Sequence, residues 1–381
     1  MTELSSGPDG ILPVQSLRAA TAAGVIESRE FKIPDASFQP ASLDLRLGGK
    51  AYRLRCSFLP QDTPVQTKLS EFVMGEISLR DGGILERNRP YLIPLVEELR
   101  LPKNIYGKTN PRSSTGRLDI FTRVITDHSH RFDEISPGYH GKLFLEVVSR
   151  SFTIQVKEGL SLNQVRLVKG EYRSTDQALL DFHDHTPIIF VDGEPAKHDE
   201  LTVANGVFLS IDVTGDENNV VGYKAKKNSY LLDLCAVGKY NAEDFWEPVY
   251  GERKHRLVLE PEDLYLLLSA ERVRIPPEFA AEMIAYDPTS GELRTHYAGF
   301  FDPGFGYDVH GLLKGTRAVM EVRAHDVPFM IEDRQKVCKL EFQSMAEPPN
   351  VLYGSEIGSS YQNQELTLSR QFRPRKGPMP V

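Results

Sequence analysis

The sequence contains only three cysteines, Cys56, Cys235 and Cys338, and no two of them form a C-x-x-C pair. This scarcity argues against a cysteine-ligated zinc site and against a disulfide framework. No apolar run approaches membrane-spanning length, and the first residues lack the basic and apolar regions of a signal peptide. We therefore expect a soluble protein of a reducing cytoplasm, without membrane association.

The sequence also has fewer basic than acidic residues. The 45 lysine and arginine residues are outnumbered by 53 aspartate and glutamate residues, and the formal net charge is −8. Broad binding to nucleic acid or to an anionic membrane requires a positive face, so we expect neither partner. A chain of 381 residues is long enough for two domains of ordinary size.

Helical periodicity is rare, and residues 14–23 are the best helix candidate. Residues 41–55 alternate apolar and polar side chains, which predicts a strand, a turn at Gly48-Gly49 and a return strand. Further short strands are expected at residues 77–79, 91–96, 107–108, 118–125, 143–148, 152–156 and 162–168. Their number and spacing predict a mainly β barrel or sandwich with a few short helices.

The second half of the chain repeats the first. Four pairs of positions are separated by 174 residues: Leu85-Glu86 and Leu259-Glu260, Tyr91-Leu92 and Tyr265-Leu266, Glu97 and Glu271, and Arg100 and Arg274. This self-similarity predicts two tandem copies of one β domain. We place the first copy in residues 1–180, a polar connecting segment in residues 181–222, and the second copy with its tail in residues 223–381.

A polar turn in the first copy combines two guanidinium groups with two hydroxyls, from Arg112, Ser113, Ser114 and Arg117. Such groups, with exposed turn N–H donors, can converge on one phosphate, although short Arg-Ser-Ser runs are also common in solvated turns. Glu146 lies in the apolar run 143–148, where a site can tune its proton affinity, but strand alternation also permits it to face water. Together the cradle and the carboxylate predict a nucleotide-processing site.

Three motifs carry a family resemblance: Arg112-Ser113-Ser114-x-x-Arg117, Ile135-Ser136-Pro137-Gly138-Tyr139-x-Gly141 and Leu143-x-Leu145-Glu146. In order and spacing they resemble the signature of dCTP deaminases, members of the trimeric dUTPase superfamily of distorted β-barrels. Residues 41–48 are similar to that family's amino-terminal strand. The segment Tyr361-Gln362-Asn363-Gln364 is similar to the tail that closes over the nucleotide. The resemblance implies two tandem dUTPase-like barrels.

The resemblance further implies hydrolysis of dCTP to dUTP and ammonia without zinc, as a step in pyrimidine deoxyribonucleotide synthesis. The histidine, glutamate and P-C-x-x-C pattern of metal-dependent deaminases is missing from the sequence. Water must then be activated by a protein base, for which Glu146 is the candidate. By resemblance, Ser113 orients that water and Arg117 supplies positive charge beside the reacting centre.

The remaining site residues also follow from the resemblance. Arg112 and Ser114 would hold the triphosphate together with its bound Mg²⁺. Further nucleotide contacts would come from Ser136, Tyr139, Tyr361 and Gln364. Sites of the superfamily lie between subunits, so the resemblance implies a homotrimer in which residues 112–117 and Glu146 come from different chains.

The chain departs from the family pattern near the sugar and in the tail. Ser136 stands where the family usually has an aspartate near the deoxyribose, and a lengthened link precedes it, so Asp133 or Glu134 is a candidate substitute. Ser360 replaces the lysine expected before the tail tyrosine, which removes a phosphate contact.

The second copy keeps part of the same set. It retains Ser290, Arg294, Asp302 and Glu321, but Thr289 and Gly291 replace the first arginine and the second serine. We expect the first copy to be the active one and the second to be mainly structural, with a second site as the alternative.

Two other functions stay open. One is a dUTP pyrophosphatase, which Ser136 disfavours in the first copy and Asp302 keeps open in the second, with a bifunctional enzyme taking dCTP to dUMP between it and the deaminase. A non-enzymatic nucleotide-sensing protein would not need the set Ser113, Arg117 and Glu146. The pairs His128/His130 and His183/His185 have metal-like spacing but no placed third ligand, so we expect no metal held by the protein alone.

Overall fold

The computed structural model describes residues 7–28, 31–285, 293–296, 299–308, 310, 312–354, 361–362 and 364–374, with the backbone alone at residues 285 and 293–296. The chain divides into two compact units. Unit 1 comprises Met1–Tyr172, Tyr230–Ala236 and Ser344–Val351, and unit 2 comprises Arg173–Ser229, Val237–Gln343 and Leu352–Val381. No helix in the described part of the chain is long and apolar enough to cross a membrane.

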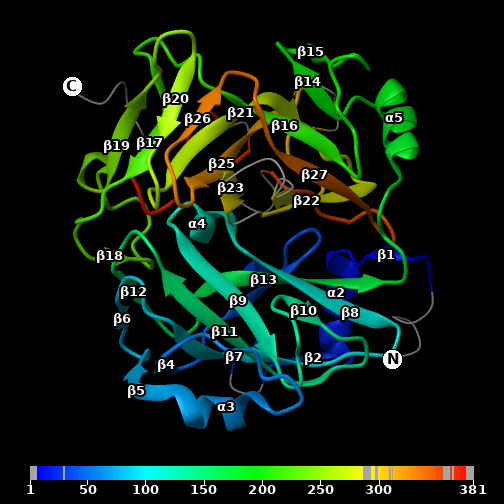
Figure 1. Cartoon of the computed structure of the whole chain (residues 1–381). Helices are drawn as coiled ribbons and strands as arrows, with labels where there is room; N and C mark the ends of the chain where they lie inside the picture. Colours follow the sequence, from blue (N-terminus) through cyan, green and yellow to red (C-terminus); the bar gives the residue numbers. More distant parts are fainter. Residues whose placement is uncertain are drawn as a thin grey trace. The chain divides into compact units, whose positions relative to one another are not determined.

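Unit 1 is built mainly of strands (Figure 1). They are β1 (Gly10–Ile11), β2 (Ile26–Ser28), β3 (Leu43–Arg46), β4 (Lys50–Leu54), β5 (Val73–Ser78), β6 (Gly83–Leu85), β7 (Tyr91–Arg100), β8 (Ile105–Pro111), β9 (Ile120–Thr126), β10 (Glu134–Ile135), β11 (His140–Ser149), β12 (Ile154–Val156), β13 (Ser161–Lys169) and β18 (Leu232–Asp233). One sheet has the order β1-β13-β8-β10 with β3 on β13, and a second has the order β5-β4-β7-β11-β9 with β2 on β7. A third, small sheet has the order β18-β12-β6.

Alternating side chains explain why these segments form half-buried strands. Along β7, Leu95, Glu97 and Leu99 are buried, whereas the residues between them are partly exposed, as expected for a two-residue period. The helices of unit 1 are α2 (Val14–Ala22), η1 (Asp35–Ser37), α3 (Val65–Phe72) and α4 (Ser113–Gly116). The predicted helix at 14–23 corresponds to α2, which buries Val14, Leu17 and Ala20 along one face.

The predicted hairpin over residues 41–55 is wrong in its pairing. Both strands form, but β3 pairs with β13 and β4 pairs with β5 and β7. Gly48 donates its N–H to Pro94 O at 2.9 Å, and a Cβ at Gly48 would meet that oxygen at 2.6 Å. The chain therefore passes close to β7 at the glycine pair, as it leaves the sheet that contains β3 and enters the sheet that contains β4.

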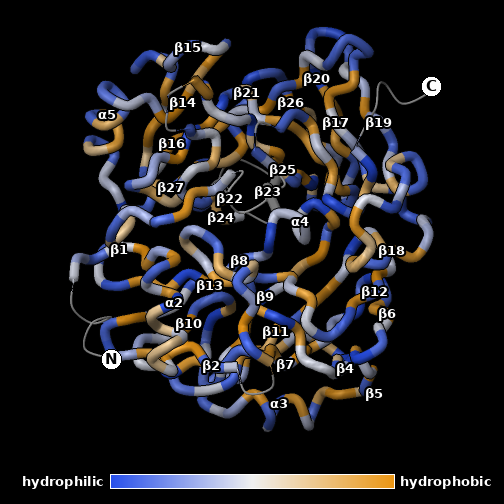
Figure 2. The backbone as a smooth tube through the Cα atoms, turned by 180° about the vertical axis from the view of Figure 1, so that it is seen from behind, coloured by the Kyte–Doolittle hydropathy of each residue, from blue (hydrophilic) through white to orange (hydrophobic). Residues whose placement is uncertain are grey.

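Unit 2 repeats this architecture around its own apolar core (Figure 2). Its elements are α5 (Asp176–His185), β14 (Ile189–Val191), β15 (Glu194–Pro195), β16 (Val207–Asp212), β17 (Val220–Ala225), η2 (Ala242–Asp244), β19 (Trp246–Tyr250), β20 (Arg256–Leu259), β21 (Tyr265–Val273), β22 (Phe279–Ala285), β23 (Leu293–His296), β24 (Phe300–Phe301), β25 (Thr316–Ala324), β26 (Phe329–Glu332) and β27 (Lys336–Ser344). Eleven of these strands form one sheet, and β20 pairs with β26.

Equivalent contacts confirm the duplication. The N–H of Glu86 donates to Tyr91 Oη at 3.2 Å, and the N–H of Glu260 donates to Tyr265 Oη at 3.0 Å. The central strand pairs, β7 with β11 and β21 with β25, carry the same register irregularity. It lies between Lys142 and Phe144 in the first pair and between Leu268 and Arg272 in the second. The predicted mainly β fold in two tandem copies is therefore confirmed.

The boundary between the copies lies earlier than the sequence pattern indicates. Residues 181–222, interpreted as a connecting segment, belong to unit 2 and contribute part of α5 and the strands β14 to β17. The pairing of β14 with β21 repeats that of β2 with β7. The strands of this segment are short and separated by turns rich in polar residues, glycine and proline. The sequence pattern therefore did not predict them.

A glutamate on the central strand of each unit accepts hydrogen bonds from a neighbouring strand, and in unit 1 this contact joins the two large sheets. Glu97, fully buried, accepts hydrogen bonds from Arg46 Nε at 2.6 Å and from the Arg46 backbone N–H at 2.7 Å. In unit 2, Glu271 accepts from the Ser210 hydroxyl at 2.6 Å and from the Ser210 N–H at 2.8 Å. The backbone contact is shared by the copies, whereas the side-chain donor has changed from a guanidinium to a hydroxyl.

We predict that Arg46→Ala destabilises the protein by roughly 3–5 kcal/mol, because it leaves the Glu97 carboxylate buried without its cation. Urea unfolding followed by circular dichroism measures this change. Ser210→Ala is the matched control, and its loss of one hydroxyl donor should cost roughly 1–3 kcal/mol. A smaller effect for Arg46→Ala than for Ser210→Ala would contradict the prediction.

Candidate active site

The predicted phosphate cradle forms a short helical turn. After β8 ends at Pro111, the Arg112 N–H donates to Leu162 O on β13 at 3.0 Å. The N–H groups of Gly116 and Arg117 then donate to Arg112 O and Ser113 O at 3.0 and 3.1 Å, respectively. Ser113 is partly exposed, but Ser114 and Arg117 are buried in this chain.

An acidic residue that the sequence analysis missed orients the cradle. Asp44 on β3 is buried, and its Oδ2 lies 2.6 Å from Arg112 Nη1. This ion pair with a buried carboxylate restricts the orientation of the Arg112 guanidinium. The family-like strand at residues 41–48 contained Asp44, but only the pairing of β3 with β13 identifies its partner.

Glu146 on β11 is buried, as one of the two interpretations of the sequence required; its exposed fraction is 1%. In the register of the sheet it lies between Leu92 on β7 and Arg123 on β9. Its Oε1 accepts hydrogen bonds from Arg123, including one from Nε at 3.0 Å. Its Oε2 is buried and has no hydrogen-bond partner among the described residues. A buried carboxylate oxygen without a donor is costly, and such an oxygen is suited to accept a proton from a ligand or water.

The cradle and Glu146 lie on different sides of the β9–β11 pair within one chain. Thr122 Oγ1 on β9 accepts a hydrogen bond from Asn163 Nδ2 on β13 at 3.2 Å, so Thr122 faces that strand. The next residue, Arg123, leaves the opposite face, and Glu146 shares that face because it lies directly across from Arg123. The Ser113 turn, in contrast, begins beside β13.

The turn at Ser136 lies apart from the cradle as well. Ile135 pairs with Gly107 on β8, so about five residues, or ~17 Å of strand, separate this end of β8 from Arg112. Ser136 is exposed, and the Tyr139 hydroxyl donates to Lys142 O at 2.6 Å. Burial, together with the charge of Asp127, raises the pKa of Tyr139 well above its usual range, so its hydroxyl stays protonated.

The candidate substitutes for the missing aspartate differ in their contacts. Asp133 Oδ1 accepts from the Val124 N–H at 2.8 Å and from the Thr109 hydroxyl at 2.7 Å, so it stabilises the loop before β10. Glu134 is exposed and pairs with Arg131 at 3.2 Å. Of the two carboxylates, Glu134 is the one directed to solvent.

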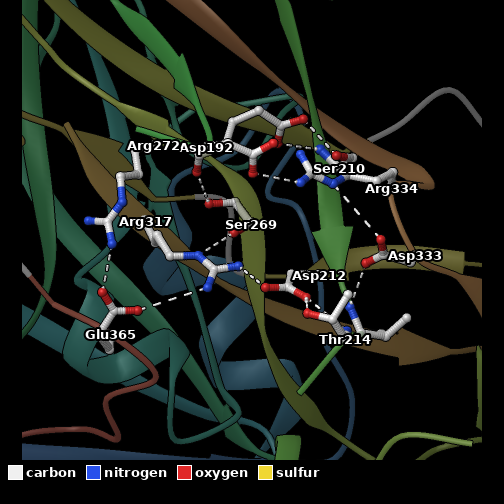
Figure 3. Close-up of polar contacts among 12 residues, drawn as sticks. Asp192, Ser210, Asp212, Thr214, Ser269, Arg272, Arg317, Asp333, Arg334 and Glu365 are labelled. Carbon is white, nitrogen blue, oxygen red and sulfur yellow. Dashed lines mark hydrogen bonds and ion pairs between the residues drawn. The ribbon is translucent and has the colours of Figure 1, made fainter. Parts of the chain in front are cut away.

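The tail residues contact unit 2. The Gln362 amide bonds to Gly304 O, Gly306 N–H and Tyr307 O, each at 3.1 Å, and Gln364 Nε2 donates to Arg317 O at 3.1 Å. Figure 3 shows Glu365 between Arg272 and Arg317, with Asp212 on the other side of Arg317. Tyr361 and Gln364 are buried there, so the predicted nucleotide cover lies beside the Asp302 turn of the second copy.

That turn is equivalent to the one in the first copy. The Phe305 N–H donates to Asp302 O at 3.1 Å, as the Tyr139 N–H donates to Ser136 O at 3.1 Å. Asp302 and Glu321 are buried in unit 2. Thr289, Ser290, Gly291 and Ser360 lie outside the described residues, so the predictions for these positions stay predictions. The backbone of Arg294 lies on β23 across from Arg323, whereas Arg117 precedes β9, so the register does not support the predicted equivalence of Arg294 and Arg117.

The tail is anchored at its far end by an aromatic cluster. Phe372 packs against Phe245 and Trp246, with ring centroids 5.5 and 6.1 Å apart, and the N–H of Tyr240 donates to Gln371 O at 3.2 Å. Phe245 and Trp246 are buried. The cluster is therefore a buried packing contact within unit 2.

One histidine of each pair has a side-chain hydrogen-bond partner in the structure. His183 is buried between Ala196 O and the Ile188 N–H, and His130 Nδ1 lies 2.7 Å from Gln61 Oε1. Within the described ranges, no group of three His, Cys, Asp or Glu side chains is arranged to hold a metal ion.

Comparison with known proteins places the chain among enzymes of deoxyribonucleotide metabolism. Models of the amino-terminal and carboxyl-terminal domains of 2'-deoxycytidine 5'-triphosphate deaminase match residues 8–171 and 175–372. The crystal structure of that deaminase from Agrobacterium tumefaciens aligns with a TM-score of 0.83 and 42% identity, over 89% of this chain and 99% of that chain. The chain belongs to the dCTP deaminase family.

Two further relatives have lower sequence identity to this chain. A dUMP-forming dCTP deaminase of Methanothermobacter thermautotrophicus is 27% identical over 138 residues, or 36% of this chain and 67% of that protein. A dCTP deaminase of Haemophilus ducreyi is 32% identical over 114 residues, or 28% of this chain and 56% of that protein.

We predict that Phe372→Ala releases the end of the tail and destabilises unit 2 by roughly 3–5 kcal/mol, because it removes a buried ring. Hydrogen exchange should show faster exchange of the Tyr240 amide. Glu365→Gln is the matched control, and loss of its exposed ion pairs should cost roughly 0–1 kcal/mol. Unchanged protection of Tyr240 in Phe372→Ala would exclude this anchoring role.

Proposed function

We propose that the chain deaminates dCTP by hydrolysis and that Glu146 is the general base. The chain is an enzyme of the dCTP deaminase family. The observation that supports the role of Glu146 is its buried carboxylate, with Oε1 bonded to Arg123 and Oε2 without a donor among the described residues. A nucleotide-sensing protein without catalysis is therefore set aside.

The reaction balances with water as the sole co-reactant. Glu146 Oε2 accepts a proton from water as the water oxygen bonds to C4 of cytosine, and the carboxylic acid then protonates N3. The remaining water-derived proton transfers to the amino group, the C4–N bond breaks, and ammonia leaves as the C4 carbonyl forms. The products are dUTP and ammonia, with no change of oxidation state.

The other roles follow the family resemblance, and the contacts of the turn are compatible with them. Arg112, oriented by Asp44, would bind the triphosphate with Ser114, while Ser113 and Arg117 would position the water and stabilise charge at the reacting centre. Mg²⁺ would enter as part of the substrate, because this ion prefers phosphate oxygens and water to a cage of protein ligands.

We further propose a homotrimer with active sites between subunits. The argument is geometric: Glu146 and the Ser113 turn leave opposite sides of the β9–β11 pair, so one chain does not bring them together. A neighbouring chain that supplies the missing half would complete the site, and closed cyclic symmetry would repeat it.

The product and the compartment are also proposals. Some relatives are dUMP-forming, and Asp302 gives the second copy the aspartate that Ser136 replaces in the first, so a bifunctional enzyme is the second candidate. The exposed cysteines Cys56 and Cys235 fit a reducing cytoplasm, where the reaction would serve synthesis of pyrimidine deoxyribonucleotides.

The first test follows ammonia, dUTP and pyrophosphate together during incubation with dCTP and Mg²⁺. We predict ammonia and dUTP from the wild-type protein, and a loss of turnover of roughly 10²–10⁴-fold in Glu146→Gln, because an amide cannot accept the proton from water. Binding of dCTP, measured by calorimetry, should persist in that variant.

Glu321→Gln is the matched control at the equivalent position of the second copy. It should keep most of the activity if the first copy is the active one. Pyrophosphate released with ammonia would select the bifunctional enzyme. Near-normal turnover by Glu146→Gln would remove this residue from the role of base.

The second test mixes two inactive variants, Ser113→Ala and Glu146→Gln, after joint unfolding and refolding. If each site takes its turn from one chain and its carboxylate from another, random mixing should restore about a quarter of wild-type activity, because one site in four then receives both native residues. Light scattering should give the mass of a trimer. No recovery of activity would indicate that each site is built from one chain.

A further inference from the structure

Arg123 holds Glu146 in an unusual way. An arginine facing a carboxylate often forms two parallel hydrogen bonds, one to each oxygen. Here both Nε, at 3.0 Å, and Nη2 of Arg123 donate to the same oxygen, Oε1. Oε2 consequently remains without a donor from this guanidinium, although it is fully enclosed.

The guanidinium is itself fixed from three directions. It lies over the ring of Phe132 with 3.9 Å between Cζ and the ring centroid, and over the ring of Phe121 at 4.8 Å. Its Nη2 also donates to the hydroxyl of Ser57 at 3.1 Å. Stacking on two aromatic rings and a third hydrogen bond leave the planar group little freedom to turn toward Oε2.

Two segments surround this guanidinium on the face of β9 and β11 that is opposite to β13. The N–H of His128 donates to Thr63 O at 3.1 Å, and the N–H of Val65 donates to Asp127 Oδ1 at 2.7 Å. These bonds join the loop after β9 to the segment that contains α3. Phe132 and Ser57, which hold Arg123, come from this loop and this segment.

We infer that Arg123 is a positioning residue for the deamination. It holds Glu146 through Oε1, so that Oε2 is the oxygen presented to the water that attacks the base. The inference rests on the proposed function of Glu146. It assigns a role to a residue that makes its contact with the carboxylate, not with the nucleotide.

The second copy offers a natural comparison at this position. In the register of β23 and β25, His296 lies across from Glu321, as Arg123 lies across from Glu146. Arginine stays charged at any pH at which proteins fold, whereas histidine titrates near neutrality. At this position of the register the sequence therefore has arginine in the first copy and histidine in the second.

This difference suggests a test that distinguishes a positioning role of Arg123 from a merely structural one. Arg123→His should make the rate, relative to wild type, fall as pH rises through the histidine pKa near neutrality, because the imidazole then loses the charge that holds Oε1. Arg123→Lys keeps the charge at every pH tested and should show a pH-independent loss of about tenfold from its poorer geometry. The groups facing position 123 are Glu146, Phe121, Phe132 and Ser57.

A third variant separates positioning from folding. Arg123→Met should lower kcat by roughly 100-fold with little change in the Kd for dCTP, because the carboxylate is misplaced and the binding groups are not. Arg123→Met also leaves a buried carboxylate without its cation, so its melting temperature should fall. The double variant Arg123→Met/Glu146→Gln should recover that temperature without recovering activity.

Arg53→His is the matched control. Arg53 is an arginine of β4 in the same sheet and pairs with the exposed Glu86 at 3.4 Å. Its variant should keep the wild-type pH profile. A flat rate ratio for Arg123→His, or wild-type kcat in Arg123→Met, would overturn the positioning role while Glu146→Gln still tests the proposed base. Absence of ammonia from the wild-type protein would overturn both.

Discussion

The register of β11 is the constraint on which the candidate site depends. Hydrogen bonds to β7 on one side and to β9 on the other fix Glu146 across from Leu92 and Arg123. Because side chains alternate between faces, a slip of one residue would exchange Glu146 for Leu145 or Val147, whose side chains fill the interior. The irregularity between Lys142 and Phe144 absorbs the mismatch with β7 before the chain reaches the carboxylate.

The two copies conserve a scaffold and differ in the groups placed on it. Both copies keep the strand pairing, the register irregularity and a backbone N–H bonded to a glutamate, Glu97 or Glu271. The side-chain donor to that glutamate is Arg46 in one copy and Ser210 in the other. Backbone hydrogen bonds are independent of side-chain identity, so the fold persists while the chemistry of each copy changes.

Much of the fold could be predicted because it depends on local patterns. Alternation predicted most strands, spacing of apolar residues predicted α2, and a fixed offset predicted the duplication. The partners of β3 and β4 could not be predicted, because a Gly-Gly pair is as compatible with a change of sheet as with a hairpin. The start of unit 2 was hidden by short strands separated by turns.

For the site, the sequence indicated residue types but not their neighbours. Glu146 and the Arg112 turn were predicted from chemistry and order, but Asp44 and Arg123 were not, since each contacts a residue far away in the chain. Their contacts, Arg112 with Asp44 and Arg123 with Glu146, are created by strand pairing. The tail was predicted by resemblance, but its contact with Arg317 in unit 2 was not.

Unit 1 is made of three separate segments of the chain, which matters when the chain is divided into fragments. Its small sheet includes β18, whose Leu232 pairs with Ile154 of β12, and the N–H of Ala346 donates to Ile11 O at 2.9 Å. A fragment ending at Tyr172 would therefore lack β18, which pairs with β12. It would also lack the N–H of Ala346, which donates to Ile11 O. Open strand edges of this kind favour association with other chains. The two compact units are thus interleaved in sequence, and a fragment cut between them would expose open strand edges.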